Sequence, residues 1–432
     1  MAEFPTGLHS PGANAIKTIE TFYVRPRWLF VRVETESGVV GWGEATLEGH
    51  TEAVEGVFTD LRERFIGWDS AAIEDIWQTA YRLRFYRGGP VMMSAISGLD
   101  IALWDIKGKT LGVPVWQLLG GKVRDKCRCY GWIGGDKPSD VLAQAVARKA
   151  EGFTAVKMNA VEDVWSDAFG VIINVEQVDW LASPDIVDAV VERVKEVKSI
   201  GIDVGLDFHG RVHRPLAKQL AKALEPHRPL FIEEPLLPGQ PQEIQALAAS
   251  TTIPIALGER LFTRQEFRPY FEAGCVDIVQ PDVAHAGGIS EVRRIANMAE
   301  YVTSFVHLFG GINGLQNIRH RARAALPARP HRARGLLAAR LRDAELCHLR
   351  DELEGGIHYN SAEHDLLTYI RNPAAFAVRD GMVDVAGLSR PGLGIDIDEK
   401  RVRAEDGKFR AGEVNAWRNP VWRGPDGALR EW

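Results

Sequence analysis

Hydrophobic and polar residues alternate along the first part of the chain in a pattern typical of antiparallel strands. Residues 17–45 alternate with a period of two and contain a turn at Glu36-Ser37-Gly38, which predicts a meander of about three strands. Apolar residues then recur at helical spacing over 51–66, 71–84 and 91–111, and Gly112 follows the last of these segments. This pattern predicts an α+β domain over residues 1–125.

The pattern changes from about residue 126 onward. Short apolar strands alternate with amphipathic helices, and the predicted strands cover 153–159, 203–210, 228–235, 253–260 and 276–283. This alternation indicates βα units and a parallel sheet, so we expect an α/β barrel over residues 126–375. The segment 376–432 is rich in Gly, Pro and Trp, and we expect it to pack back on the first domain.

Composition excludes several classes of protein. The 432 residues carry 52 basic and 58 acidic side chains, a net charge of −6, which argues against a general nucleic-acid binder. No apolar run reaches the roughly 18 residues of a transmembrane helix, and the first residues lack a signal-peptide pattern. The four cysteines form neither a disulfide framework nor a zinc-binding spacing. We therefore expect a cytoplasmic protein that binds no membrane.

Three acidic residues end consecutive predicted strands. Asp207, Glu233 and Glu259 are each 26 residues apart, which is one βα unit. Successive parallel strands lie about 4.8 Å apart, so these carboxylates converge at the end of the barrel where active sites form. A single such acid would fit an ordinary loop start. Three together favour a hard cation with oxygen ligands, and Mg²⁺ leaves positions for water and substrate.

Four further polar residues are candidates for the same site. His209 lies two residues after Asp207, so strand alternation places both side chains on one face, and histidine is the usual general acid or base. Asp282 ends the next strand, where it orients a histidine or caps a helix. Lys157 and Asn159 face the pore from an earlier strand, either as substrate ligands or as polar residues of the barrel mouth.

Together these motifs resemble the mandelate racemase-like branch of the enolase superfamily. The resemblance covers most of 17–163, 178–300 and 356–432, and rests on the segments PRWLFVRVETESGVVGWGEA, FYRGGPVMMSAISGLDIALWDIKGK, PVWQLLGGKVRDK, GLDFHGRV, LEPHRPLFIEEP, IPIALGER, QPDVAHAGGISE, GIHYN and WRNPVWR. It implies a modified TIM (β/α) barrel with a capping domain formed by the N-terminal segment and the C-terminal tail.

The resemblance also implies an activity. It implies Asp207, Glu233 and Glu259 as Mg²⁺ ligands, His209 as general acid, and Asp282 as partner of a histidine base on the following strand. The implied reaction is the dehydration of a sugar acid, by removal of the C2 proton and loss of the C3 hydroxyl. D-galactonate is the expected substrate, with gluconate or another aldonate as the alternative, and a homo-oligomer is expected. A non-catalytic sugar-acid binder is the alternative from another class.

One segment departs from the family pattern. The family carries its histidine base in an Ala-Pro-His-Cys-Pro-Leu-Gly-Pro motif shortly after a Met-Ala-Glu, which here is Met298-Ala299-Glu300, and the motif is absent. His307, His320 and His331 do not stand in that setting. Residues 319–352 contain nine Arg, eight Ala and no Lys. An Arg-rich surface helix is one explanation for this composition. A nucleic-acid-binding insertion is another, but the negative charge of the rest of the chain opposes it.

A shifted reading frame explains the departure better. Codons for residues 319–352 can be chosen so that the frame one nucleotide away encodes the missing motif and the helix and strand that follow it. We therefore hypothesise a retained intron over 301–316 and a second, in-frame case over 164–177. We expect a barrel disrupted at 301–355, without its seventh and eighth strands, and weak or absent activity of this chain.

Overall fold

The computed structural model describes a large part of the chain, namely residues 12–25, 27–82, 85–122, 125–133, 138–159, 185–301, 305–306, 366–415, 421 and 429. The predictions for 164–177 and 307–355, including those for His307, His320 and His331, lie outside the described residues. Among the helices that are described, none combines the length and the apolar character needed to cross a bilayer.

The N-terminal residues form the predicted antiparallel meander. Strands β1 (Ile16–Val24), β2 (Trp28–Thr35) and β3 (Val40–Glu44) pair in chain order, and they are followed by α1 (Thr51–Phe65), α2 (Ile73–Arg82) and α3 (Pro90–Leu111). Helix α3 is buried along most of its length and ends at Gly112, which adopts a left-handed φ of 70°. It packs very closely on β3, because a Cβ on Gly43 would lie 2.1 Å from the carbonyl oxygen of Gly98.

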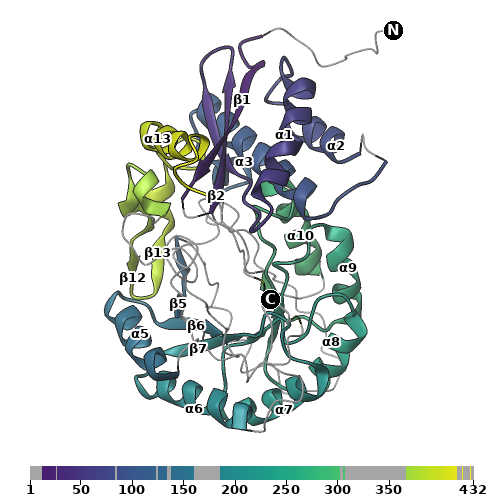
Figure 1. Ribbon diagram of the computed structural model, residues 1–432, viewed down its shortest axis with the longest axis vertical. Helices are drawn as coiled ribbons and strands as arrows, with labels where there is room; N and C mark the ends of the chain where they lie inside the picture. Colours follow the sequence, from purple (N-terminus) through teal and green to yellow (C-terminus); the bar gives the residue numbers. More distant parts are fainter. Residues whose placement is uncertain are drawn as a thin grey trace.

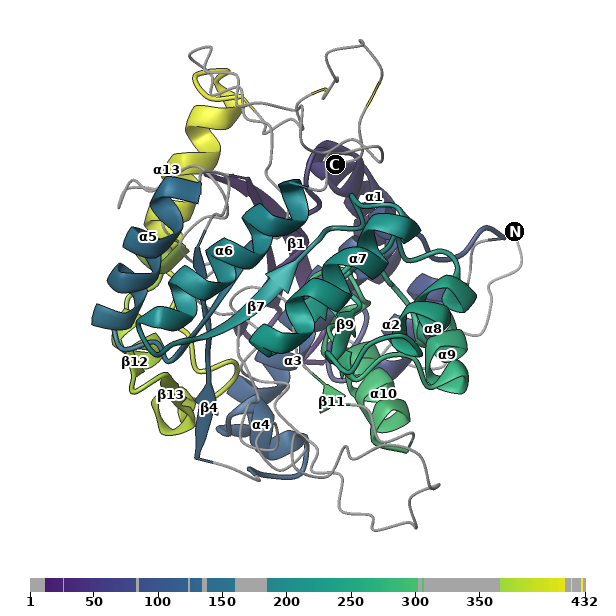
Figure 2. The ribbon, with the colours of Figure 1, turned by 90° about the horizontal axis from the view of Figure 1, so that it is seen from below.

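A second sheet contains seven parallel strands in sequential order. They are β5 (Gly131–Ile133), β6 (Ala155–Asn159), β7 (Asp203–Asp207), β8 (Ile232–Glu233), β9 (Ile255–Leu257), β10 (Ile278–Val279) and β11 (Phe305–Val306). Six helices follow the strands along the outside of this arc (Figure 1), namely α5 (Pro138–Ala150), α6 (Asp185–Ser199), α7 (Arg214–Leu224), α8 (Pro241–Ala248), α9 (Arg264–Ala273) and α10 (Gly288–Tyr301). The view from below shows α6 beside β7 and next to α7 (Figure 2).

This order of strands and helices is that of a TIM-like barrel. Within the described residues, the edge strands β5 and β11 are not paired with each other, so the barrel is not closed there. The expectation that the seventh strand is missing is wrong for its first two residues, because Ile278 and Val279 of β10 pair with Phe305 and Val306. Phe305 and Val306 are apolar and follow the end of α10 at Tyr301 by four and five residues.

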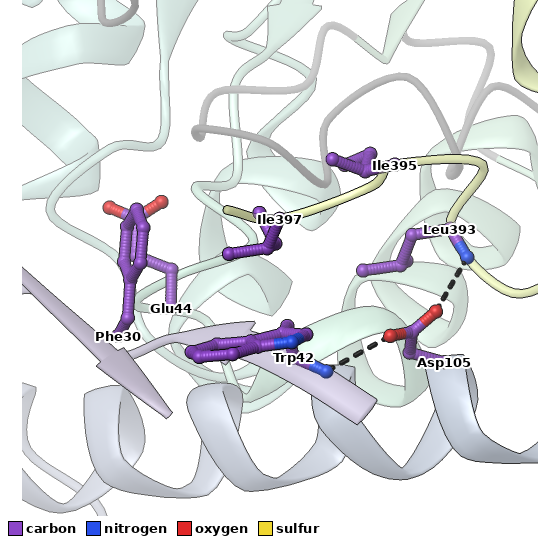
Figure 3. Close-up of a pocket in the computed structure, with 8 residues that line it drawn as sticks. Phe30, Trp42, Glu44, Asp105, Leu393, Ile395 and Ile397 are labelled. Carbon is purple, nitrogen blue, oxygen red and sulfur yellow. Dashed lines mark hydrogen bonds between the residues drawn. The ribbon is translucent and has the colours of Figure 1, made fainter. Parts of the chain in front are cut away.

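The C-terminal segment returns to both earlier parts of the chain. Strand β13 (Met382–Asp384) pairs with β12 (Val378–Arg379) and with β4 (Lys126–Arg128), while α13 (Glu399–Arg410) packs against β1. The Asp105 carboxylate of α3 accepts a hydrogen bond from the backbone N–H of Trp42 and another from that of Leu393, both at 2.9 Å (Figure 3). One buried side chain thus links the N-terminal sheet to the tail. The domain boundaries at 125 and 375 stay a prediction.

The remaining short elements complete these connections. They are α4 (Val115–Leu118) and the 3-10 turns Glu225–His227, Leu366–Tyr369, Pro373–Phe376 and Val385–Leu388. The largest core cluster runs from the barrel into the tail, and a second one fills the space between the N-terminal sheet and helices α1 to α3.

Candidate active site

The predicted carboxylates stand at the ends of adjacent barrel strands. Asp207 is the last residue of β7 and Glu233 the last residue of β8, and the two are direct partners in the parallel register. Asn159, at the end of β6, is the register partner of Asp207 on its other side. Glu259 comes two residues after β9, in a partly exposed turn. The structure therefore brings together three of the predicted residues by strand register and places Glu259 beside them.

Lys157 connects the first two carboxylates. Its Nζ lies 2.7 Å from Oδ2 of Asp207 and 3.2 Å from Oε2 of Glu233, and all three side chains are buried. Burial alone would raise the pKa of Asp207, but the charges of His209 and Lys157 outweigh it, and the pKa lies below the ordinary value. For Glu233, burial and the charge of Asp207 raise the pKa well above the ordinary value. One ammonium group thus leaves the paired acids incompletely neutralised.

The donor set suits a hard cation, although the side chains are not arranged around one. Among the described residues, no group of three His, Cys, Asp or Glu side chains is placed to hold a metal ion. However, Oε1 of Glu233 is buried and has no hydrogen-bond partner in the part of the chain that the structure describes, which is costly for a carboxylate oxygen. Oxygen-only donors with one buried lone carboxylate oxygen fit a cation such as Mg²⁺, provided that Lys157 moves aside.

His209 lies beside Asp207, although not for the reason that strand alternation gives. Strand β7 ends at Asp207, and His209 follows in a turn with a left-handed φ of 48°. Its Nε2 lies 3.3 Å from Oδ2 of Asp207, and its backbone N–H donates to Oδ1 at 3.1 Å. The prediction of two side chains on one strand face is therefore wrong, while the predicted proximity is correct.

Asp282 lies three residues after β10, immediately before the turn at 283–287. Its Oδ1 accepts a hydrogen bond from the backbone N–H of Ala284 at 2.6 Å, and α10 begins only at Gly288, so Asp282 does not cap that helix. Burial raises the pKa of Asp282 to about 8. The following strand, β11, contains no histidine within its described residues Phe305 and Val306, and the motif expected to carry the base is absent from the sequence.

Sequence reasoning missed a second histidine next to Asp282. Nε2 of His285 lies 3.7 Å from Oδ2 of Asp282, and Nδ1 of His285 is 2.9 Å from the hydroxyl of Ser94 on α3. Burial lowers the pKa of His285 to about 4, so this imidazole is neutral at pH 7. The sequence signal that could have predicted this contact is the position of His285, three residues after Asp282.

Three polar residues around Glu233 were also missed. Gln280 donates from Nε2 to Oε2 of Glu233 at 2.9 Å. Glu234 is buried and forms an ion pair with Arg260. Glu234 and Arg260 directly follow the predicted ligands Glu233 and Glu259, and Gln280 lies two residues before Asp282. The motifs that contain the predicted carboxylates therefore also contain these residues.

Comparisons with known proteins agree with this arrangement. Residues 3–120 match the N-terminal domain of the mandelate racemase / muconate lactonizing enzyme family, and residues 140–401 match the enolase C-terminal domain-like family. The chain belongs to the enolase superfamily. Its mandelate racemase-like branch therefore accounts for the N-terminal α+β domain and the parallel barrel.

Curated relatives and solved structures extend the similarity over nearly the whole chain. D-galactonate dehydratase from Ralstonia pickettii (strain 12J) is 45% identical over 428 residues, covering 96% of this chain and 100% of the relative. The enzyme of the same name from Pectobacterium atrosepticum is 45% identical over 419 residues, with coverages of 96% and 100%. An enolase from Agrobacterium radiobacter, solved with bound Na and L-malate, has a TM-score of 0.75 at 26% identity, covering 96% of this chain and 99% of its own.

Proposed function

We propose that this chain is a Mg²⁺-dependent sugar-acid dehydratase, a carbon–oxygen hydro-lyase that converts D-galactonate to 2-keto-3-deoxygalactonate and water. The observation that carries the proposal is the cluster of Asp207 and Glu233 in register, with Glu259 near them and His209 at 3.3 Å from Asp207. The full-length similarity to D-galactonate dehydratases supports the choice of substrate.

The proposed roles follow from charge and position. Asp207, Glu233 and Glu259 would hold Mg²⁺, which supplies positive charge for the substrate carboxylate as the C2 proton leaves. His209 would donate a proton to the departing C3 hydroxyl, because the imidazole lies at the edge of the carboxylate cluster and is partly exposed. Lys157 and Asn159, both buried at the end of β6, would bind the substrate carboxylate or a hydroxyl group.

A non-catalytic sugar-acid binder is the second candidate, and a specific observation favours it. The motif that carries the family's histidine base is absent from the sequence after Glu300. Asp282 would orient such a base, but no histidine after Glu300 stands in the family's base motif. Such a chain would retain the ligands and the acid but lack the group that removes the C2 proton.

Incubation with D-galactonate and Mg²⁺ in deuterated water separates these functions. A dehydratase produces the keto acid, an enzyme with a base but no working acid exchanges the C2 proton for deuterium, and a binder does neither. Gluconate and other aldonates run in parallel decide the substrate. Binding without exchange or product would contradict the dehydratase proposal for this chain.

A second comparison tests the origin of residues 301–355. A chain translated from transcript without the hypothesised introns should turn over faster than the chain as written. Equal activity of both chains would refute the hypothesis, and so would a mature transcript that retains 164–177 and 301–316.

We also propose a cytoplasmic homo-oligomer. The chain has no cysteine pattern of an oxidising compartment, and its resemblance to the family supports self-association. Sedimentation velocity of the purified protein checks the oligomeric state, and a purely monomeric species would contradict self-association.

A further inference from the structure

The turns that follow β7, β8 and β9 are joined by one guanidinium group. Nη2 of Arg260 donates a hydrogen bond to the backbone carbonyl of His209 at 2.8 Å, and the same nitrogen contacts the Glu234 carboxylate. The backbone N–H of Gly210 also donates to the carbonyl of Glu234 at 2.8 Å. Arg260 and its two partners, His209 and Glu234, lie one or two positions after a predicted metal ligand, so Arg260 connects the three strand ends of the site.

The backbone at two of these positions needs support. His209 has a φ of 48° and Glu234 a φ of 37°, and they are two of the four non-glycine residues with positive φ in the described part of the chain. Such a conformation is strained for a residue with a side chain and persists only where surrounding contacts hold it. The hydrogen bond from Arg260 to the His209 carbonyl is one of those contacts.

Packing leaves the guanidinium little freedom around this backbone. A Cβ on Gly210 would lie 2.9 Å from Nη2 of Arg260 and 2.9 Å from Cα of Leu237, so only a glycine fits between them. Glu234 is completely buried, whereas the Arg260 side chain is 34% exposed. A buried carboxylate with an arginine partner is a fixed anchor, because separating the pair would leave an uncompensated charge in the interior.

We infer that Arg260, anchored by Glu234, is the positioning residue for His209. It fixes the backbone of the proton donor relative to Asp207, so the imidazole is held at the edge of the carboxylate cluster. This inference rests on the proposed function, in which His209 protonates the leaving hydroxyl. A misplacement of about 1 Å in such a group is enough to lower a rate about 100-fold.

The first test compares leaving groups. Fluoride in place of the C3 hydroxyl leaves as an anion without a proton from His209, while removal of the C2 proton is unchanged. Arg260→Gln should lower dehydration of D-galactonate by about 10–100-fold, at or below the lower end of the roughly 100- to 10,000-fold effect of a general acid, because the displaced His209 is still present. It should change fluoride release from 3-deoxy-3-fluoro-D-galactonate less than about threefold. The dehydration rate of Arg260→Lys, which keeps one hydrogen-bond donor, should fall between those of the wild-type chain and Arg260→Gln.

Arg264→Gln is the matched control. Arg264 begins α9, is 28% exposed in its side chain and pairs with the buried Glu291, without contacting His209. It should leave both reactions unchanged. Equal losses with both leaving groups, or no loss with either, in the Arg260 variants would overturn the inference.

The second test does not depend on turnover. Crystal structures of the wild-type chain and of Arg260→Gln should show that His209 leaves its left-handed conformation and that its Nε2 moves away from Oδ2 of Asp207. An unchanged His209 overturns the inference, and Arg260→Lys serves if the glutamine variant does not fold. If the wild-type chain processes neither substrate, the proposed function fails, and this structural comparison still decides the role of Arg260.

Discussion

Asp100 of α3 is a buried carboxyl group at the contact between α3 and α10, and its substitution by asparagine should remove a pH dependence of stability. Its two oxygens accept hydrogen bonds from the backbone N–H of Ser290 at 3.0 Å and from the hydroxyl of Ser290 at 2.6 Å. Burial raises the pKa of Asp100 from 3.8 to about 7, against the opposing effect of the Ser290 hydrogen bonds. The native state therefore holds this proton more tightly than the unfolded chain does.

The sign and size of the effect follow from that difference. Because the pKa is higher in the folded state, the contribution of Asp100 to stability is full below about pH 4 and decreases as the pH rises to about 7. Each pH unit inside this window corresponds to about 1.4 kcal/mol, so the free energy of unfolding should lose about 3 kcal/mol between pH 5 and pH 7 from this group. Above pH 7 the loss is constant.

The side-chain amide introduced by Asp100→Asn would mimic the neutral carboxyl group. Its oxygen can accept from the Ser290 N–H, and its NH₂ can donate to the Ser290 hydroxyl, which already accepts from Nε1 of Trp104 at 3.0 Å. Urea unfolding at pH 5, 6, 7 and 8 should therefore show a variant that gains stability relative to the wild-type chain as the pH rises from 5 to 7, with no further gain at pH 8. Asp188→Asn, at an exposed position of α6, is the control and should give a constant difference. Parallel curves for Asp100→Asn and the wild-type chain would refute the reasoning.

Three further predictions concern the site and the packing around it. Glu233→Gln should abolish the rise in melting temperature that Mg²⁺ produces, and an undiminished Mg²⁺ effect would argue against the ligand role. Without metal, the variant should be at least as stable as the wild-type chain at pH 8, because burial and the charge of Asp207 disfavour the ionised Glu233. Asp105→Ala should lower the free energy of unfolding by about 2–4 kcal/mol and expose 376–415 to limited proteolysis, because it leaves two buried backbone donors unpaired. Gly43→Ala should lower the melting temperature of the whole chain, since its Cβ would lie 2.1 Å from a backbone oxygen of α3, and an unchanged melting temperature would contradict this close packing.

Much of the fold could be predicted because short-range patterns determine it. The helix predicted over 91–111 is observed at Pro90–Leu111, and the one predicted over 51–66 at Thr51–Phe65. Helix α13 was missed, because its only buried residue is Val402 and a helix without an apolar face has no periodic signal. Contacts with β1 stabilise it, and those contacts are distant in the sequence.

The active site also contains features that the sequence predicts and features that it does not. A spacing of 26 residues predicts that Asp207 and Glu233 end neighbouring strands, because the βα unit repeats along the chain. The same spacing says nothing about Lys157 between them or about the left-handed turn at His209. Those features depend on contacts between extended side chains from three different strands, and such contacts leave no periodic pattern in the sequence.

Different segments of the chain supply the metal-binding and the proton-abstracting parts of the site, so one function can be lost without the other. The carboxylates, Lys157 and His209 come from β6 to β9 and the turns that follow them, whereas the family's histidine base belongs to a motif that is absent here after Glu300. Loss of that base removes proton abstraction but leaves the ligand cluster and the acid intact. A chain that binds Mg²⁺ and galactonate but exchanges no C2 proton therefore has a defect located after Glu300, and restoring the histidine motif there should be sufficient to restore turnover.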